Sequence, residues 1–161
     1  MRKITSRFTL IALLAALLCV TGCVNFKKLQ EIKIVDAKLE SLSPVSLRQY
    51  VVSGLVTVDN PAAEVSVSEI SGVLEHNGKV IGSIAVDPIT LSAKSEQTCR
   101  LRGDAKVADG VGILELAKYM DKKVLKECVV DVKADVRIKN GKVRTVTLED
   151  VPLNKLLELI R

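Results

Sequence analysis

The chain has 161 residues, 48% of them hydrophobic, and carries a formal net charge of +5. This length and apolar content suit one domain of ordinary size with its own core. Aromatic residues make up only 2% of the chain. Because nucleic-acid sites on single strands depend on aromatic stacking faces, we expect no nucleic-acid partner, and glycan binding is equally disfavoured.

The first 22 residues have the parts of a secretory signal peptide. Arg2, Lys3 and Arg7 supply a basic start, and an apolar stretch from 8 to 20 follows. This stretch is shorter than the roughly 20 apolar residues that a membrane-spanning helix needs. We therefore predict a signal peptide over 1–22, with an uncleaved anchor or a buried N-terminal helix as the alternatives.

The segment Val20-Thr21-Gly22-Cys23 resembles the lipobox of bacterial lipoproteins, in which small residues precede a cysteine that is alkylated with a diacylglyceryl group. The resemblance implies that Cys23 becomes the lipidated first residue of the mature chain. Several acyl chains anchor a protein stably, so residues 23–31 are predicted to be a lipidated tether to the membrane. Val24 stands where an Asp marks inner-membrane retention in enteric lipoproteins, which favours the outer membrane, facing the periplasm.

Beyond residue 31 the dominant pattern is alternation of apolar and polar residues, clearest at 35–39 and 130–138. Such alternation is typical of strands with one solvated face. The pairs Asn77-Gly78 and Asn140-Gly141 each lie between two such runs and favour two-residue type I′ hairpins. The other runs expected to form strands are 50–58, 70–75, 80–86, 88–91, 98–107 and 143–148. The spacing predicts a mainly β fold, an antiparallel β-sandwich of about seven strands.

Helical spacing occurs in two segments. After Asp109, a candidate N-cap, apolar residues recur at helical intervals and predict one inserted amphipathic helix over 111–122. At the C-terminus, Pro152 favours the start of a short helix, with a final strand as the alternative. The apolar face of that C-terminal helix would consist of Leu153, Leu156, Leu157 and Ile160.

Two stretches resemble the late embryogenesis abundant type-two family, whose domain is also called the water-stress and hypersensitive-response (WHy) domain. They are LVTVDNP (55–61), a strand ending in Asn60-Pro61, and ISGVLEHNGKVIG (70–82), a hairpin turning at Asn77-Gly78. The resemblance implies a fibronectin-III- or immunoglobulin-like sandwich with an extra helix, forming a single domain over 32–161. It also implies a role in stress protection, and it attaches no catalytic residue to these motifs, which are structural.

Cys99 and Cys128 are the two thiols that remain after lipidation of Cys23. In an oxidising periplasm such a pair is a candidate disulfide. The alternative is two buried free cysteines, since cysteine packs well as a small apolar residue.

No set of catalytic or metal-binding residues converges in the sequence. His76 is the only histidine; without partners for a metal site or a triad, it is expected to be a surface residue beside a turn. Gly110 and Gly112 lack the third glycine of a phosphate-binding turn, because Glu115 occupies its place. A basic cluster near the second hairpin either contacts anionic lipid or an acidic partner, or forms a solvated sheet face. Its members are Lys133, Arg137, Lys139, Lys142 and Arg144.

The predicted function is therefore that of a non-enzymatic, lipid-anchored envelope protein, a binding or stress-protective module without cofactor or metal. Its expected partners are the membrane, through the anchor, and an envelope protein or lipid. The alternative is a carrier or chaperone for an apolar ligand or lipid held between the sandwich and its helix. A carrier needs an open apolar cavity of at least a few hundred Å³, whereas a protective module needs only a filled core.

Overall fold

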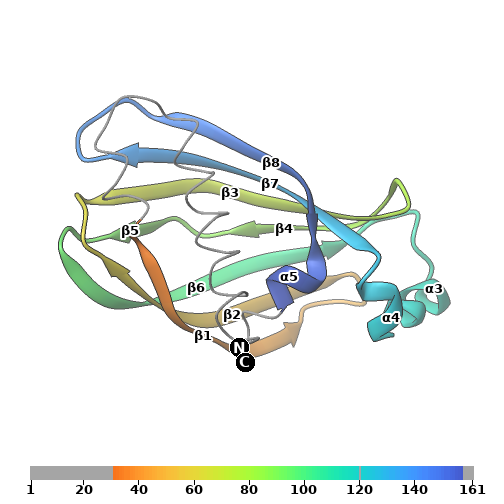
Figure 1. Ribbon diagram of the computed structural model, residues 1–161. Helices are drawn as coiled ribbons and strands as arrows, with labels where there is room; N and C mark the ends of the chain where they lie inside the picture. Colours follow the sequence, from red (N-terminus) through yellow and green to blue (C-terminus); the bar gives the residue numbers. More distant parts are fainter. Residues whose placement is uncertain (1–30, 120, 158–161) are drawn as a thin grey trace.

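The computed structural model describes residues 31–119 and 121–157 (Figure 1). Eight antiparallel strands form one continuous sheet in the order β1-β2-β6-β4-β3-β7-β8, and β5 pairs with β3 beside this path. The strands are β1 (Lys33–Pro44), β2 (Gln49–Asn60), β3 (Val65–His76), β4 (Lys79–Val86), β5 (Ile89–Leu91), β6 (Ser95–Val107), β7 (Cys128–Ile138) and β8 (Arg144–Pro152). The prediction of a mainly β, antiparallel fold is confirmed, with one strand more than the seven expected.

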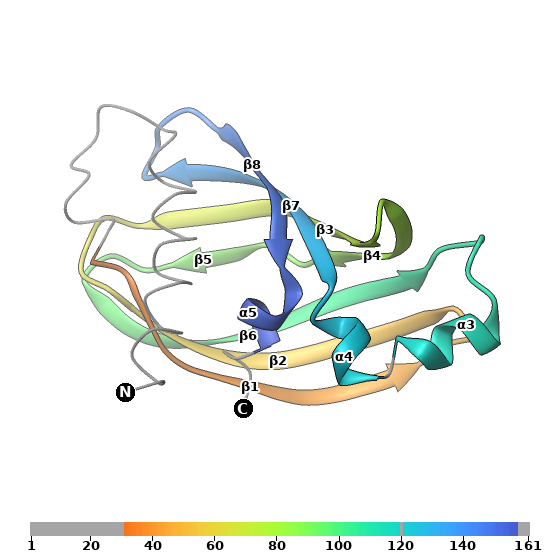
Figure 2. The same ribbon diagram turned by 45° about the vertical axis from the view of Figure 1, so that its right-hand side comes forward.

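The sheet is strongly curled (Figure 2). A first core cluster joins the two edge strands of the sheet. Ile32, next to β1, packs in the same cluster as Val146 of β8. Val58 and Val136, from β2 and β7, belong to this cluster too. The alternation in the sequence thus places one residue in two on the concave face, where burial of apolar surface stabilises the fold.

A second core cluster fills the other end of the sheet. Ile81, Val111, Tyr119 and Cys128 are buried there, and partly buried apolar side chains of the helices pack against them. Residues 32–119 and 121–157 contain the eight described strands and both clusters. The chain from residue 23 onward therefore includes every element that the structure describes.

The single helix predicted over 111–122 is wrong in its extent. Two shorter helices occupy the region, α3 (Ile113–Lys118) and α4 (Lys122–Leu125). Asp109 is not the N-cap, since α3 begins after Gly112. The side chain of Asp121 instead accepts a hydrogen bond from the Lys123 N–H at 2.8 Å and caps α4. The first N–H groups of a helix have no partner within the helix, and an N-cap side chain supplies one. Asp121 therefore marks the start of a separate helix, α4.

At the C-terminus, β8 ends at Pro152 and α5 (Leu153–Leu157) follows, as the helical alternative predicted. Leu153 packs against the second cluster. Ile160, the last member of the predicted helix face, lies outside the described residues. No helix in the described residues is both long and apolar enough to cross a membrane.

The first Asn-Gly hairpin forms with the predicted two-residue turn, whereas the second joins the predicted strands, β7 and β8, through a longer connection. Asn77 and Gly78 have φ angles of +50° and +79°, both positive as a type I′ turn requires. At Asn140-Gly141 the connection is longer, with β7 ending at Ile138 and β8 starting at Arg144. Just after β7, the Lys139 N–H donates to the carbonyl of Glu64, the residue before β3, at 2.9 Å.

Candidate functional site

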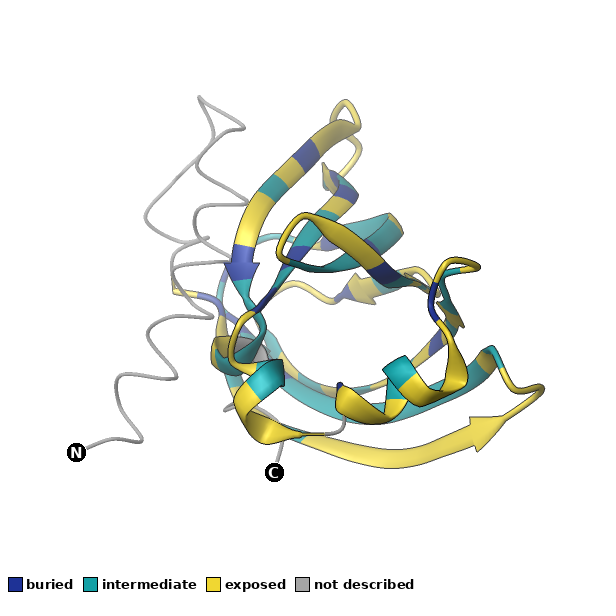
Figure 3. Cartoon of the chain, turned by 90° about the vertical axis from the view of Figure 1, so that its right-hand side faces the viewer, coloured by how far each residue is buried: buried dark blue, intermediate teal, exposed yellow. Residues whose placement is uncertain are grey.

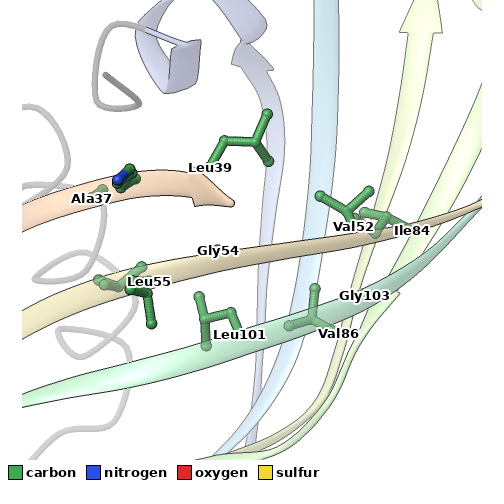
Figure 4. Close-up of a pocket in the computed structure, with 11 residues that line it drawn as sticks. Ala37, Leu39, Val52, Gly54, Leu55, Ile84, Val86, Leu101 and Gly103 are labelled. Carbon is green, nitrogen blue, oxygen red and sulfur yellow. The ribbon is translucent and has the colours of Figure 1, made fainter. Parts of the chain in front are cut away.

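An apolar groove of about 190 Å³ lies on the face of the sheet formed by β1, β2, β4 and β6 (Figure 4). Val52 and Ile84 lie next to each other in it, and Leu39 projects from the edge strand β1. The residues that line the groove are Ala37, Lys38, Leu39, Val52, Gly54, Leu55, Val56, Ile84, Val86, Leu101 and Gly103. Lys38 is the only charged residue among them. The groove therefore offers apolar contact and no set of acid, base or nucleophile.

The groove occupies the gap between the two core clusters. Along β6, Cys99 packs against the first cluster and Val107 against the second, while Leu101 and Gly103 line the groove between them. Antiparallel pairing places Gly54 of β2 opposite Leu101. A Cβ on Gly54 would lie 2.9 Å from the Lys38 carbonyl oxygen, and one on Gly103 would lie 3.0 Å from Cδ1 of Ile84. Glycine at these two positions therefore permits the close approach of a neighbouring strand or side chain.

The edge strand β1 forms an open rim. Leu39 is directly opposite Gly54, and Leu42 is opposite Val52, so these side chains lie on the same face as the groove. Leu39 is 46% exposed and Leu42 is 60% exposed. The apolar surface of the groove thus continues past its edge to solvent-exposed leucines.

Asn60, predicted to have a structural role at the end of a strand, is completely buried. Its side-chain amide donates to the carbonyls of Ala63 and Ser92, at 2.9 and 3.1 Å, and its Oδ1 accepts from the Ala62 N–H at 3.0 Å. Pro61, directly after β2, contributes no N–H to the ladder. This motif stabilises the end of β2 and does not line the groove.

Cys99 and Cys128, the candidate disulfide pair, are not bonded to each other in this structure, in which both thiols are free. Cys99 packs at the first cluster and Cys128 at the second, so the length of the concave face separates them. Burial raises the pKa of the Cys128 thiol, with a smaller contribution from the nearby Glu127. A buried thiol with a raised pKa is a poor nucleophile.

His76 is half-buried rather than a plain surface residue. Its Nε2 lies 3.0 Å from Oε2 of Glu127, and its ring meets that of Tyr119 edge to face, with centroids 5.5 Å apart. Burial also raises the pKa of the Tyr119 hydroxyl. The contacts of His76 with Glu127 and Tyr119 join the β3–β4 hairpin to the helical segment. Within the described residues, no group of three or more metal-ligating side chains occurs.

The remaining sequence candidates lie outside the groove. The five residues of the basic cluster around the β7–β8 connection are all exposed, and its acids have local partners: Asp135 accepts from Thr145 and Asp131 from the Asp150 N–H. Gly110 and Gly112 form the approach to α3. Cys23 and the predicted signal peptide over 1–22 lie outside the described residues.

Sequence reasoning missed the groove residues themselves. The available signal was the pair of glycines, Gly54 and Gly103, inside runs expected to form strands. A glycine in a strand interior weakens the strand, which points to a bulge or a close approach by another group.

Comparison with known proteins identifies no family. No protein-family model matches the chain, and no curated protein matches it. Among solved structures, a protein from Archaeoglobus fulgidus is 17% identical, with a TM-score of 0.45 over 73% of this chain and 94% of that chain. A β-glucuronidase from glycoside hydrolase family 2 is 8% identical, with a TM-score of 0.34 over 70% of this chain, which spans only 11% of that enzyme. At these values neither structure transfers a function to this chain.

Proposed function

We propose that this protein is a non-enzymatic, lipid-anchored module of the cell envelope that holds an apolar chain, such as a lipid acyl chain, on the concave face of its sheet. The observation that carries the proposal is the groove between the two clusters, lined almost entirely by aliphatic side chains and glycine. Its volume of about 190 Å³ is smaller than the roughly 300–1,000 Å³ of pockets for drug-sized ligands. A slender acyl chain lying along the groove suits this size better than a bulky ligand.

The groove is smaller than the few hundred Å³ that a carrier cavity needs, so it would hold only part of an acyl chain. The exposed apolar rim of β1 is what supports the carrier over a purely protective module. A protective module needs only a stable core and a polar surface, whereas Leu39 and Leu42 leave apolar surface exposed on β1. The groove is lined by strand residues alone, so the ligand would lie against the sheet and not between the sheet and the inserted helical segment. Membership of the late embryogenesis abundant type-two family remains part of the proposal, supported by the strand that ends in Asn60-Pro61 and the hairpin at Asn77-Gly78.

The proposal is tested with an apolar fluorophore, phenylnaphthylamine, displaced by palmitic acid. The chain from residue 23, carrying Cys23→Ser, is compared with a Val52→Phe variant that fills the groove. Val143→Phe is the matched control, because Val143 is exposed in the β7–β8 connection, outside the groove. We expect Val52→Phe to weaken palmitate binding at least about fivefold, a change of about 1 kcal/mol, and Val143→Phe to leave it unchanged. Equal affinities of the two variants, with normal thermal unfolding, would contradict the proposal.

The anchor is a separate part of the proposal, carried by the lipobox resemblance at Cys23. It places the protein at the outer membrane, on the periplasmic side, with the membrane, an envelope lipid or an envelope protein as its partner. Mass spectrometry of the chain isolated from its envelope tests it directly. We expect a mature N-terminus at Cys23 bearing a diacylglyceryl group and an amide-linked acyl chain. A chain that begins at Met1, or an unmodified Cys23 sulfur, would rule the anchor out.

A further inference from the structure

The edge strand β1 is open to solvent along most of its length. It pairs with β2 on one side, and no strand of the described chain pairs with its outer edge. In Figure 3, β1 is the lowest strand and is exposed over nearly all of its residues. The backbone N–H and carbonyl groups of such an edge are available to pair with a strand of another chain.

Exposed apolar side chains distinguish β1 from the other edge strand, β8. Val35 is 42% exposed, and Leu39 and Leu42 of the groove rim are more exposed still. β8, which the structure describes in full, carries no large apolar side chain of comparable exposure. Because an exposed apolar edge strand favours pairing between chains, β1 is the edge suited to a partner.

Two bulges limit where β1 can accept a further strand. Its register against β2 is irregular just before Asp36 and just after Leu39. Bulges at an edge interrupt pairing with another chain, so pairing is confined to the regular stretch 36–39. This stretch contains one acid, Asp36, and one base, Lys38. Neither forms an ion pair with another residue that the structure describes.

Antiparallel pairing with a second copy of this chain has one register that suits these charges. Directly opposed residues of an antiparallel pair share a face of the sheet, so a symmetric pair must be centred on a residue that faces itself. With Ala37 facing Ala37, Asp36 of each copy faces Lys38 of the other. With Asp36 or Lys38 facing itself, like charges are opposed, which is destabilising.

Leu39, the remaining residue of the stretch, is a poorer centre. With Leu39 facing itself, Lys38 would face Glu40, which lies at the second bulge and already accepts a 3.1 Å hydrogen bond from Nε of Arg100. The Ala37 register avoids this conflict and also brings Leu39 of each copy next to Val35 of the other. Apolar surface that is exposed in one chain is thereby buried between two.

We propose that two copies of this chain pair antiparallel through β1, with Ala37 at the two-fold axis and Asp36 of each copy facing Lys38 of the other. Such a closed pair uses the same surface in both copies. The inference concerns self-association and so goes beyond the proposed function. One consequence rests on that function: Ala37 and Leu39 line the groove, so the two grooves adjoin across the seam. Together they have about twice the 190 Å³ of one groove, which reaches the few hundred Å³ that a carrier needs.

Analytical ultracentrifugation of charge variants tests the pairing and its register. The chain from residue 23 with Cys23→Ser, over a micromolar to submillimolar range, is expected to show a monomer–dimer equilibrium. Lys38→Glu opposes two carboxylates at each end of the seam and should weaken dimerisation at least about tenfold. The exchange variant Asp36→Lys/Lys38→Asp opposes unlike charges again and should dimerise as the parent chain does. Lys33→Glu is the matched control, because it makes the same charge change on β1 outside the paired stretch, and it should leave dimerisation unchanged.

Cross-linking locates the two-fold axis. Opposed residues of an antiparallel pair have Cα atoms roughly 4.5 or 5.5 Å apart, a distance that a disulfide spans. Under mild oxidation, Ala37→Cys should therefore give disulfide-linked dimers faster than Thr147→Cys, an exposed position on the other edge strand, β8. The parent chain, which keeps Cys99 and Cys128, measures the background.

Four results would each overturn the proposal. They are a parent chain that stays monomeric over the whole range, equal weakening by Lys38→Glu and Lys33→Glu, a folded exchange variant that fails to dimerise, and equal cross-linking at positions 37 and 147. Failure of the parent chain to bind palmitate while it still dimerises would contradict the groove function alone.

Discussion

Asn60 and Ser92 are joined by a 3.1 Å hydrogen bond from the Asn60 side-chain amide to the Ser92 carbonyl, across 32 residues of sequence. Asn60 has no exposed surface, so water cannot replace its partners. The same side chain also accepts from the Ala62 N–H. One buried amide therefore holds the exit of β2 against the turn that precedes β6.

Asn60→Ala should lower the free energy of unfolding by about 2 to 3 kcal/mol, because it leaves a buried backbone N–H and carbonyls without partners. Asn60→Asp should be at least as damaging at neutral pH, since it keeps the acceptor but loses both donors and buries a charge. Urea denaturation measures both. Asn140→Ala, at an exposed asparagine, should change stability by less than about 0.5 kcal/mol. A comparable loss in Asn140→Ala would refute the special role of Asn60.

Alanine should be tolerated at Gly103 and not at Gly82. A Cβ on Gly103 would meet the Cδ1 of Ile84 at 3.0 Å, and that flexible side chain borders the groove and has room to move. A Cβ on Gly82 would come within 2.7 Å of the Lys106 carbonyl oxygen, which belongs to the backbone of a paired strand. We expect Gly82→Ala to cost about 1 to 3 kcal/mol and Gly103→Ala less than about 1 kcal/mol, by chemical denaturation. The opposite order would show that Ile84 cannot yield.

The two described thiols should differ in reactivity. Cys99 is only partly buried, whereas Cys128 is fully buried and its pKa is raised by that burial. Alkylation followed by peptide mass spectrometry should modify Cys99 first and Cys128 only when the protein unfolds. The raised pKa also keeps Cys128 protonated where the unfolded chain has already lost that proton. Stability should therefore fall as the pH rises above the unfolded pKa of the thiol, and Cys128→Ala should flatten this alkaline decline. Faster labelling of Cys128 than of Cys99 would contradict the arrangement of the second cluster.

Glu115 and Lys79 connect α3 to the start of β4. The hydrogen bond from Lys79 lowers the pKa of Glu115, and the bond to Glu115 raises the pKa of Lys79. The stabilisation from Glu115 is therefore present above its unfolded pKa and is lost as the pH falls through its lower folded pKa. Titration followed by NMR should show the Glu115 pKa rising toward its ordinary value in Lys79→Met. It should rise much less in Lys118→Met, because Lys118 acts on Glu115 only through a weaker charge interaction. Equal effects of the two variants would mean that the ion pair does not form in solution.

Several differences between predicted and observed elements have local physical causes. The strand expected at 70–75 begins at Val65, because the register of β3 against β7 shifts between Ser68 and Ser71. Glu69 has a φ angle of +48° at that point. Such a bulge reverses the alternation of faces, so the period-two pattern is interrupted at the very place where the strand continues. The helix predicted over 111–122 was divided for an equally local reason, the side-chain cap made by Asp121.

By itself the sequence determined the features that depend on near neighbours in the chain. These are the alternating antiparallel strands, the hairpin at Asn77-Gly78, and the placement of Asn60-Pro61 at the end of a strand. Only the tertiary structure decided the groove and the separation of Cys99 from Cys128. Each of these depends on the register and curl of strands that are distant in sequence. A period-two pattern shows which residues share a face of a strand, but it does not show which residues of other strands pack against them.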